Sequence, residues 1–367
     1  MLTTAIFPGR YVQGANALDQ LGTEAHRLGD QALVLIDPHV DDAMHDAIAA
    51  DMAEREPLIL RFEGECSQNE IDRVTEAARD VDADVIVGVG GGKTMDTAKA
   101  VAHALGRPVL IAPTIASTDA PCSALSVIYT PDGAFERYLV LPKNPDVVLV
   151  DTAVCAKAPV RFLVAGMGDA LATWFEAESC RIKGAANMTG RPGTMSAFAL
   201  GRLCYDTLME YGRLARTAAE LDVVTPALEH VVEANTLLSG LGFESGGLAA
   251  CHAIHNGLTR LEATHSYWHG EKVAIGVLAG LFLSDQPSAR VDEVYEFCLD
   301  VGLPVTLAQI GLSDVSDEDL MQAAQGACAP GETIHNEPLD ATPETVFWAL
   351  KVADAEGRRR MEARSSA

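Results

Sequence analysis

Hydrophobic and polar positions follow two different patterns in the two halves of this chain. Over residues 1–158, short runs of apolar, often β-branched residues alternate with segments of helical periodicity. Ser67 is expected to begin one of these helices, because Glu70 follows at the capping-box spacing. Strands that alternate with helices predict a parallel sheet with helices on both faces. The expected buried strands are Ala32–Asp37, Pro57–Phe62, Asp84–Val89, Pro108–Ala112 and Val147–Val150.

From Pro159 onward the periodicity is helical, and β-branched alternation is nearly absent. A chain of 367 residues suits two domains of ordinary size. We therefore expect an α/β domain over residues 1–158 and an all-α domain over residues 159–367, the latter with loops at Gly184–Gly193 and Asp285–Ser288. The expected helical segments are Val160–Tyr211, Leu221–Gly240, Gly247–Leu258, Val273–Leu283, Val291–Val301, Glu318–Ala327 and Pro343–Arg360.

The charge balance narrows the classes of partner. Asp and Glu number 52 against 27 Lys and Arg, a formal net charge of −25. Such a surface repels phosphate backbones and anionic lipids, so neither nucleic acid nor membrane is expected as a partner. The eight cysteines are scattered without a CxxC pair, which is typical of reduced thiols in a cytoplasmic protein. The N-terminus lacks the pattern of a signal peptide, and no apolar run is long enough to span a bilayer.

A glycine-rich turn follows the third expected strand. Val85–Gly92 reads VIVGVGGG and leads through Lys93 into an Ala-rich helix. Glycines allow backbone N–H groups to approach an anion, and the helix N-terminus and Lys93 add positive charge, so a pyrophosphate fits this turn. The pattern is neither GxGxxG nor a P-loop, so an ordinary strand-to-helix turn remains the alternative.

Two further segments are expected at the same edge of the sheet. Asp37 ends a strand and either binds the ribose hydroxyls of NAD or terminates the strand in a turn. The run Pro113–Ser123 contains several hydroxyl side chains and the carboxylate of Asp119, and it follows another strand. Ligands of open α/β sheets bind at the carboxyl ends of the strands, so this run is a shaped binding loop or a solvated connection.

Metal-ligand chemistry is concentrated in the second half. Four of the ten histidines, His252, His255, His265 and His269, lie within one short stretch. Imidazole is a common zinc ligand, and His252 and His255 would share one face of a helix. A carboxylate is needed to complete such a site, and Asp169 in AGMGDAL is the best candidate. We expect Asp169 at a helix start, where an N-cap role competes with metal binding.

Together these motifs resemble the glycerol dehydrogenases of the iron-containing alcohol dehydrogenase superfamily, which share their fold with dehydroquinate synthase. The resemblance is carried by GGGKTMDTAK, PTIASTDAPCSALSVIY, GMGDALATWFEA, GFESGGLAACHAIHNGLT and HGEKVAIG, and it runs over nearly the whole chain. It implies an α/β NAD-binding domain followed by a helical metal-binding domain. It also implies that Asp169, His252 and His269 bind zinc and that Asp119 contacts the polyol. The implied NAD-binding residues are Asp37, Gly91, Gly92, Lys93, Thr114, Ser117, Ser123, Leu125 and Tyr129.

One departure from the family bears on the metal. Iron-dependent members have a further histidine four residues after the aspartate, and this chain has Thr173 there, which favours zinc. The implied reaction is the NAD-linked oxidation of glycerol, or a similar vicinal diol, to a hydroxyketone such as dihydroxyacetone. Asp119, His252 and His255 are the expected catalytic residues, with His255 as a candidate proton relay. The family also suggests a homo-oligomer, often an octamer.

Three other functions are alternatives to this oxidation: two enzymes that act on phosphorylated substrates and one non-catalytic binding protein. A dehydroquinate synthase-like lyase or a glycerol-1-phosphate dehydrogenase shares the fold but must bind a phosphorylated substrate. Such a substrate calls for Lys and Arg, and the segments Ser117–Ser126 and Gly242–Leu258 contain neither. A non-catalytic nucleotide- or metal-binding protein is the third alternative, although all the implied ligands are present.

Overall fold

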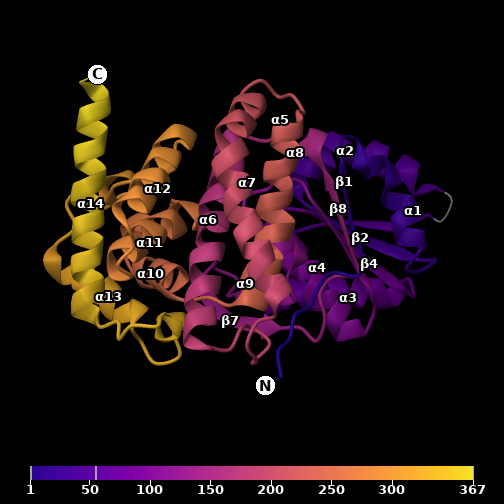
Figure 1. The fold of residues 1–367 in the computed structure, drawn as a ribbon. Coiled ribbons are helices and arrows are strands. Elements are labelled where there is room, and N and C mark those ends of the chain that lie inside the picture. Colours follow the sequence, from indigo (N-terminus) through magenta and orange to yellow (C-terminus); the bar gives the residue numbers. More distant parts are fainter. Residues whose placement is uncertain (1, 54–55, 367) are drawn as a thin grey trace. The chain divides into compact units, whose positions relative to one another are not determined.

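The computed structural model describes residues 2–53 and 56–366, which form two compact units (Figure 1). We call them the sheet unit, residues 6–53, 56–160 and 218–240, and the helical unit, residues 2–5, 161–217 and 241–366. The chain therefore leaves the sheet unit, returns to it once and leaves it again. The segment 218–240, which the sequence analysis assigned to the helical half, makes its contacts within the sheet unit.

The sheet unit contains a six-stranded parallel sheet with the strand order β1-β8-β5-β4-β2-β3. A separate antiparallel pair, β6 and β7, follows β5 in the chain. The sequence analysis did not predict β1 or this pair. The strands are β1 (Tyr11–Gly14), β2 (Ala32–Ile36), β3 (Leu58–Arg61), β4 (Val85–Gly90), β5 (Val109–Pro113), β6 (Leu125–Tyr129), β7 (Phe135–Val140) and β8 (Val147–Asp151).

Helices cover both faces of the parallel sheet, as predicted. Along β2, Leu33 and Leu35 pack in one core with residues of α3 and α4, while Val34 and Ile36 pack in a second core with residues of α1 and α2. All five positions of β2 are buried, which explains its unbroken apolar sequence. The helices of this unit are α1 (Leu21–His26), α2 (Pro38–Asp51), α3 (Gln68–Asp80), α4 (Gly92–Leu105), α5 (Thr152–Lys157) and α8 (Pro226–Glu233).

The helical unit is built from long, largely buried helices, and the predicted all-α character of this part of the chain is confirmed. Its elements include α6 (Val160–Lys183), α7 (Met195–Ala219), α9 (Ser239–Gly246), α10 (Ala250–Leu258), α11 (His269–Leu283), α12 (Ser288–Val301), α13 (Asp317–Ala327) and α14 (Pro343–Ser365), of which α6, α7 and α9 begin or end in the sheet unit. Among residues 2–53 and 56–366, no helix combines the length and apolarity needed to cross a bilayer.

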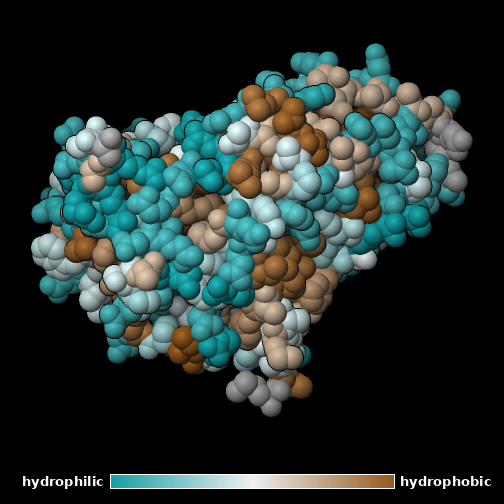
Figure 2. All heavy atoms as spheres, turned by 45° about the horizontal axis from the view of Figure 1, so that its top comes forward, coloured by the Kyte–Doolittle hydropathy of each residue, from teal (hydrophilic) through white to brown (hydrophobic). Residues whose placement is uncertain are grey.

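The surface agrees with the acidic composition. On the face shown in Figure 2, hydrophilic residues predominate and hydrophobic residues appear as separate patches. Among residues 2–53 and 56–366, the most exposed large apolar side chain is Met195, at 88%, and Leu203 and Leu214 on the same helix, α7, are 51% exposed.

Candidate functional site

The order of the strands creates a switch point between β2 and β4. From β2 the chain proceeds outward to β3, whereas from β4 it proceeds in the opposite direction to β5. The connections after β2 and β4 therefore diverge, and ligands of open α/β sheets bind at the carboxyl ends of the strands at such a point. Asp37 follows β2 and the glycines follow β4, so the structure brings these predicted cofactor residues to the two sides of the switch point.

The glycine turn presents an uncapped helix end. Gly91 precedes the first turn of α4 and has no side chain to accept hydrogen bonds from the helix amides. An added Cβ at Gly92 would meet no atom within 4 Å, so space is open beside the backbone there. The 14-residue helix α4 directs its positive dipole end toward this space. The geometry suits a phosphate group.

Asp37 lies directly beside the glycine turn. A Cβ on Gly90 would come within 2.8 Å of the Cβ of Asp37, and the amide of Asp37 donates to Val89 O. The carboxylate of Asp37 also caps α2 by accepting from the amide of His39 at 2.9 Å. The nearby Arg61 pairs with Asp41 and Asp42 and donates to Pro38 O. This edge of the sheet therefore presents the carboxylate of Asp37, and the positive charge of Arg61 is compensated by Asp41 and Asp42.

Lys93 and Tyr129 lie together at the start of α4 and the end of β6. The ammonium of Lys93 lies 5.3 Å from the centre of the Tyr129 ring and forms an ion pair with Glu65. Burial, assisted by the nearby Asp96, raises the pKa of Tyr129 to about 12. Tyr129 therefore acts as a neutral ring with a hydroxyl group at neutral pH.

The hydroxyl-rich connection from β5 to β6 is a shaped loop held by a buried lysine. The ammonium of Lys99, whose side chain is fully buried, donates to Ala120 O and Leu125 O at 2.8 Å each. It also pairs with Asp96 at 3.0 Å, one helical turn away on α4. Ser123 Oγ donates to Ala120 O at 3.1 Å. Lys99 thus fixes the backbone that carries Ser123 and Leu125.

Two other predicted cofactor residues lie on the β5 side of the same loop. Thr114 follows β5, is buried, and donates its amide to Gly90 O at 3.1 Å, which ties the loop to the glycine turn. Ser117 lies farther along the loop and is partly buried. The predicted cofactor residues therefore follow the carboxyl ends of β2, β4 and β5 and the adjoining starts of α4 and β6.

Asp119 is buried in this loop and is oriented by a helix from much later in the chain. Ser239 Oγ donates to Asp119 Oδ2 at 2.8 Å, and Asn235 Nδ2 donates to Ala116 O at 3.0 Å. Both donors lie at a π-helical turn, Ala234–Leu238, that joins α8 to α9. The sequence analysis missed Ser239 and Asn235, because their segment carries only helical periodicity and polar residues without a motif.

The second set of functional side chains lies wholly within the helical unit. Asp169 is in the middle of α6, and His252 and His269 are in the first turns of α10 and α11. The expectation that Asp169 lies at a helix start is wrong, so an N-cap role is eliminated. The glycines beside Asp169 instead allow α11 to approach, since a Cβ on Gly168 would overlap Gly270 O.

The three side chains converge on one point. Asp169 Oδ1 lies 3.0 Å from His269 Nε2 and 3.3 Å from His252 Nε2, and all three candidate ligand atoms lie within 4.8 Å of one another. Around a tetrahedral zinc ion with bonds of about 2.1 Å, neighbouring ligand atoms are about 3.4 Å apart. Asp169 is fully buried, whereas the His269 side chain is 38% exposed, so one side of the cluster is open. The residues therefore fit a divalent cation with one accessible position.

The charges of the cluster are strongly coupled. Burial opposes ionisation of Asp169, but the imidazoles of His269 and His252 outweigh it and hold the pKa of this carboxyl well below its usual range. Burial would lower the pKa of His252, but the carboxylates of Glu176 and Asp169 outweigh it and raise that pKa well above its usual value. The site therefore favours a positive charge between its carboxylates, which either a proton or a metal ion can supply.

The other two histidines of the group have different positions. The His255 ring lies 4.2 Å from the His269 ring, centre to centre, and burial together with the neighbouring His269 and His252 holds its pKa well below the usual value. His255 is thus a neutral neighbour of the cluster. His265 is exposed, and its Nε2 lies 2.9 Å from Thr259 O. It does not join the cluster.

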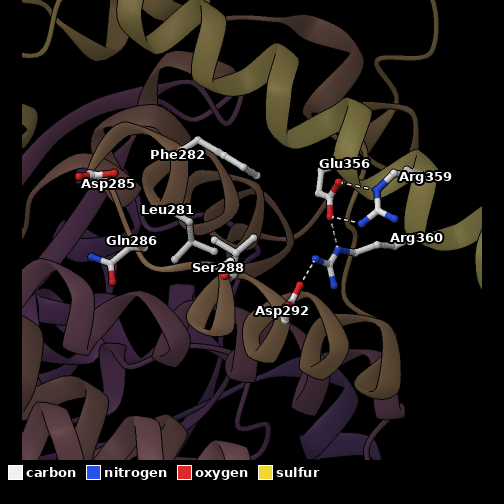
Figure 3. Close-up of a pocket in the computed structure, with 10 residues that line it drawn as sticks. Leu281, Phe282, Asp285, Gln286, Ser288, Asp292, Glu356, Arg359 and Arg360 are labelled. Carbon is white, nitrogen blue, oxygen red and sulfur yellow. Dashed lines mark hydrogen bonds and ion pairs between the residues drawn. The ribbon is translucent and has the colours of Figure 1, made fainter.

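A cavity of about 430 Å³ lies elsewhere in the helical unit, among α11, α12 and α14 (Figure 3). Its two arginines, Arg359 and Arg360, both bond Glu356, and Arg360 also pairs with Asp292. Both arginines of this cavity are therefore compensated by carboxylates, and none of the predicted site residues lines it. It is therefore a weaker candidate than the Asp169 cluster.

Comparisons with known proteins agree with this arrangement. The sequence profile of the iron-containing alcohol dehydrogenases matches residues 8–152. A glycerol dehydrogenase of Thermotoga maritima is 64% identical over 98% of this chain and 99% of its own length. The structure of a glycerol dehydrogenase from Schizosaccharomyces pombe has a TM-score of 0.95 at 39% identity, over 100% of this chain and 94% of that one. A probable glycerol dehydrogenase from Sinorhizobium meliloti has a TM-score of 0.91 at 46% identity, over 98% and 100% of the two chains.

The sheet with its switch point suits a dinucleotide, and the cluster of two imidazoles and a carboxylate suits a divalent cation. The comparisons show that the chain belongs to the iron-containing alcohol dehydrogenase family. Within that family it is similar to glycerol dehydrogenases over its whole length. The predicted fold class and the resemblance seen in the sequence motifs are thereby confirmed.

Proposed function

We propose that this protein is a zinc-dependent, NAD-linked dehydrogenase that oxidises glycerol, or a similar vicinal diol, to the corresponding hydroxyketone. The observation that carries the proposal is the convergence of Asp169, His252 and His269 within one compact unit. A relative named glycerol dehydrogenase, 64% identical over 98% of this chain, supports the substrate class.

NAD is the proposed cofactor, held at the carboxyl edge of the sheet. The uncapped start of α4, at Gly91 and Gly92, is suited to the pyrophosphate, with Lys93 as an added charge. Asp37 is suited to the ribose hydroxyls, and its carboxylate would repel the 2′-phosphate of NADP. The remaining proposed contacts are Thr114, Ser117, Ser123, Leu125 and Tyr129.

Zinc is the proposed metal, with Asp169, His252 and His269 as its ligands. Two imidazoles, one carboxylate and an accessible side form the donor set of a catalytic zinc site. The position one turn after Asp169 is the buried Thr173, so it offers no imidazole as a further ligand. Bound there, zinc would supply Lewis-acid polarisation of a substrate hydroxyl, and bound NAD would supply the hydride acceptor.

The chain's own residues orient the substrate and move its proton. Asp119, held by Ser239, accepts a hydrogen bond from a second hydroxyl of the diol and so selects for vicinal diols. His255 is neutral, and its Nδ1 lies 3.1 Å from the acceptor Asn256 Oδ1, which places the ring proton on Nδ1. Its Nε2 can then accept the proton that the substrate hydroxyl loses, and we propose His255 as the relay.

The test compares two histidines from the same sequence cluster. His252→Ala is expected to lose bound zinc and NADH formation from glycerol, followed at 340 nm, because one of three ligands is gone. His265→Ala is the matched control and should retain both, since His265 lies outside the metal cluster. Full activity of His252→Ala, or equal loss in both variants, would contradict the proposal. Release of inorganic phosphate from a phosphorylated sugar acid would favour the lyase alternative instead.

The homo-oligomer suggested by the family stays a prediction. The exposed apolar side chains Met195, Leu203 and Leu214 on α7 support association between copies of the chain. Light scattering on the purified protein would measure the assembly, and a mass of 38.9 kDa would contradict it.

A further inference from the structure

We propose that Glu176 is the positioning residue of the metal centre: it fixes the orientation and the ring tautomer of His252 and thereby sets the affinity for the metal. The inference rests on the proposed function, because it requires that the Asp169 cluster bind a metal. Glu176 had no role in the sequence analysis, and it does not itself belong to the group of converging ligand atoms.

Both oxygens of Glu176 hold the same residue. Oε2 lies 2.6 Å from His252 Nδ1, and Oε1 accepts from the backbone amide of His252 at 2.9 Å. Oε1 also accepts from the amide of Ala249 at 2.9 Å, which holds the amino end of α10. Glu176 is 1% exposed, so these bonds face little competition from water. The ring and the backbone of His252 are therefore fixed by one carboxylate.

The bond to Nδ1 determines which nitrogen is available for a metal. A carboxylate accepts the proton on Nδ1, so the lone pair is on Nε2, the nitrogen that lies 3.3 Å from Asp169 Oδ1. A carboxylate in this position also increases the basicity of the ligating nitrogen. Glu176 therefore combines an orienting effect with an electrostatic effect.

The position of Glu176 on α6 makes this possible. Asp169, Thr173 and Glu176 are spaced by four and three residues along one helix, so they share one face. All three are buried. A single rigid helix thus presents one ligand, Asp169, and the support for a second ligand on α10.

A second buried carboxylate provides a matched control. Glu337 Oε1 accepts from the amide of Ala250 at 3.0 Å, and Oε2 accepts from Ser179 Oγ at 2.8 Å. Glu337 is 4% exposed and, like Glu176, holds the amino end of α10. None of the hydrogen bonds that the structure shows for Glu337 involves an imidazole. Glu337 therefore shares the capping role of Glu176 without the contact to His252.

The experiment uses Glu176→Gln and Glu337→Gln in the full chain. Zinc affinity is measured by competition with a chromogenic chelator, and the visible spectrum of the Co²⁺-loaded protein reports the ligand geometry. Loss of a carboxylate behind a metal-binding imidazole typically weakens metal binding by about 10–100-fold. We expect such a loss and an altered Co²⁺ spectrum for Glu176→Gln, with less than about a threefold change for Glu337→Gln.

Each outcome supports or overturns the inference. Equal losses in the two variants would reduce Glu176 to a helix cap and overturn it, as would unchanged zinc affinity in Glu176→Gln. If Glu176→Gln does not fold, Glu176→Asp is compared instead. That variant keeps the charge but withdraws it by roughly 1.5 Å, and a smaller loss in the same direction is expected. Asp169→Asn tests the metal site separately from the role of Glu176. Zinc binding that survives this change would refute the metal site itself.

Discussion

The close approach of α6 and α11 offers a sharp test of how the metal cluster is assembled. Gly270 follows the proposed ligand His269 at the start of α11. A Cβ at this position would overlap Ala165 O and lie 2.7 Å from Ala165 C and 3.0 Å from the amide nitrogen of Asp169. Gly270→Ala therefore pushes the backbone next to one ligand against the backbone of another.

The magnitude follows from these distances. Restoring ordinary contacts with Ala165 C and O requires a displacement of roughly 1–1.5 Å between the helices. Overpacking of this kind costs about 1–3 kcal/mol, and the better helix propensity of alanine offsets about 0.5–1 kcal/mol. The overlap with Ala165 O places the cost near the upper limit, so the net loss is about 2–2.5 kcal/mol, which corresponds to a fall in melting temperature of about 4–10 °C. A misplacement of about 1 Å in a catalytic arrangement can also reduce turnover about 10²-fold.

Gly280→Ala, on the same helix, is the control. An added Cβ there would meet only Cys251 Sγ, at 3.6 Å, which is ordinary contact. Melting temperature, zinc affinity by chelator competition, and NADH formation are measured for both variants. Gly270→Ala should lower the melting temperature, the zinc affinity and the rate of NADH formation. Gly280→Ala should lower none of the three. A Gly270→Ala variant with the melting temperature and zinc affinity of the parent would refute the reasoning.

Two further predictions concern the buried polar groups. Lys99→Met should destabilise the fold by about 3–5 kcal/mol, because it leaves the buried Asp96 without its cation. It should also raise KM for NAD. Urea unfolding measures the first effect and steady-state kinetics the second. Burial raises the pKa of the Cys66 and Cys155 thiols to about 12, so thiolate is scarce at pH 8 in the native protein. Burial also raises the pKa of Cys328, but this thiol is partly exposed, so of the eight thiols we expect Cys328 to react first with a disulfide reagent at pH 8. Rapid reaction of several thiols in the folded protein would contradict this.

Local patterns predicted five of the six strands of the parallel sheet, but they did not predict the partners of charged side chains. The run Ala32–Asp37 was expected to be a strand, and β2 occupies Ala32–Ile36. Ser67 caps α3, with its Oγ accepting from the amide of Glu70. The carboxylate of Glu70 instead accepts from the amide of Glu63 and pairs with Arg73. Hydrophobic periodicity determines which residues are buried, whereas the competing partners of a charged side chain depend on the tertiary fold.

The error at Asp169 has a similar cause. Two glycines before an acidic residue suggest a helix start, yet α6 continues through them. The cost of glycine within a helix is accepted here because α11 packs against its backbone at Gly168. That contact is not visible in a local window. Glu176, in contrast, had a signal, since it lies seven residues after Asp169 on the same helix face.

The placement of the segment 218–240 could not be predicted from periodicity. The helical pattern of Leu221–Gly240 was recognised, but periodicity does not specify which unit the apolar face contacts. For the same reason Ser239 was missed as the partner of Asp119. A contact between residues 120 positions apart is set by the fold as a whole and has no local signature.

The π-helical turn at Ala234–Leu238 makes the phase of this helix a functional property. A π turn accommodates one more residue than an α turn, and such turns arise at functional sites more often than elsewhere. If the same residues formed a regular α-helix instead, every residue downstream would be rotated by about 100° relative to α8. Ser239 would then face away from Asp119, although no side chain of the loop itself had changed. A change that makes this short stretch a regular α-helix is therefore expected to disturb the proposed diol contact at Asp119 without altering the loop that carries it.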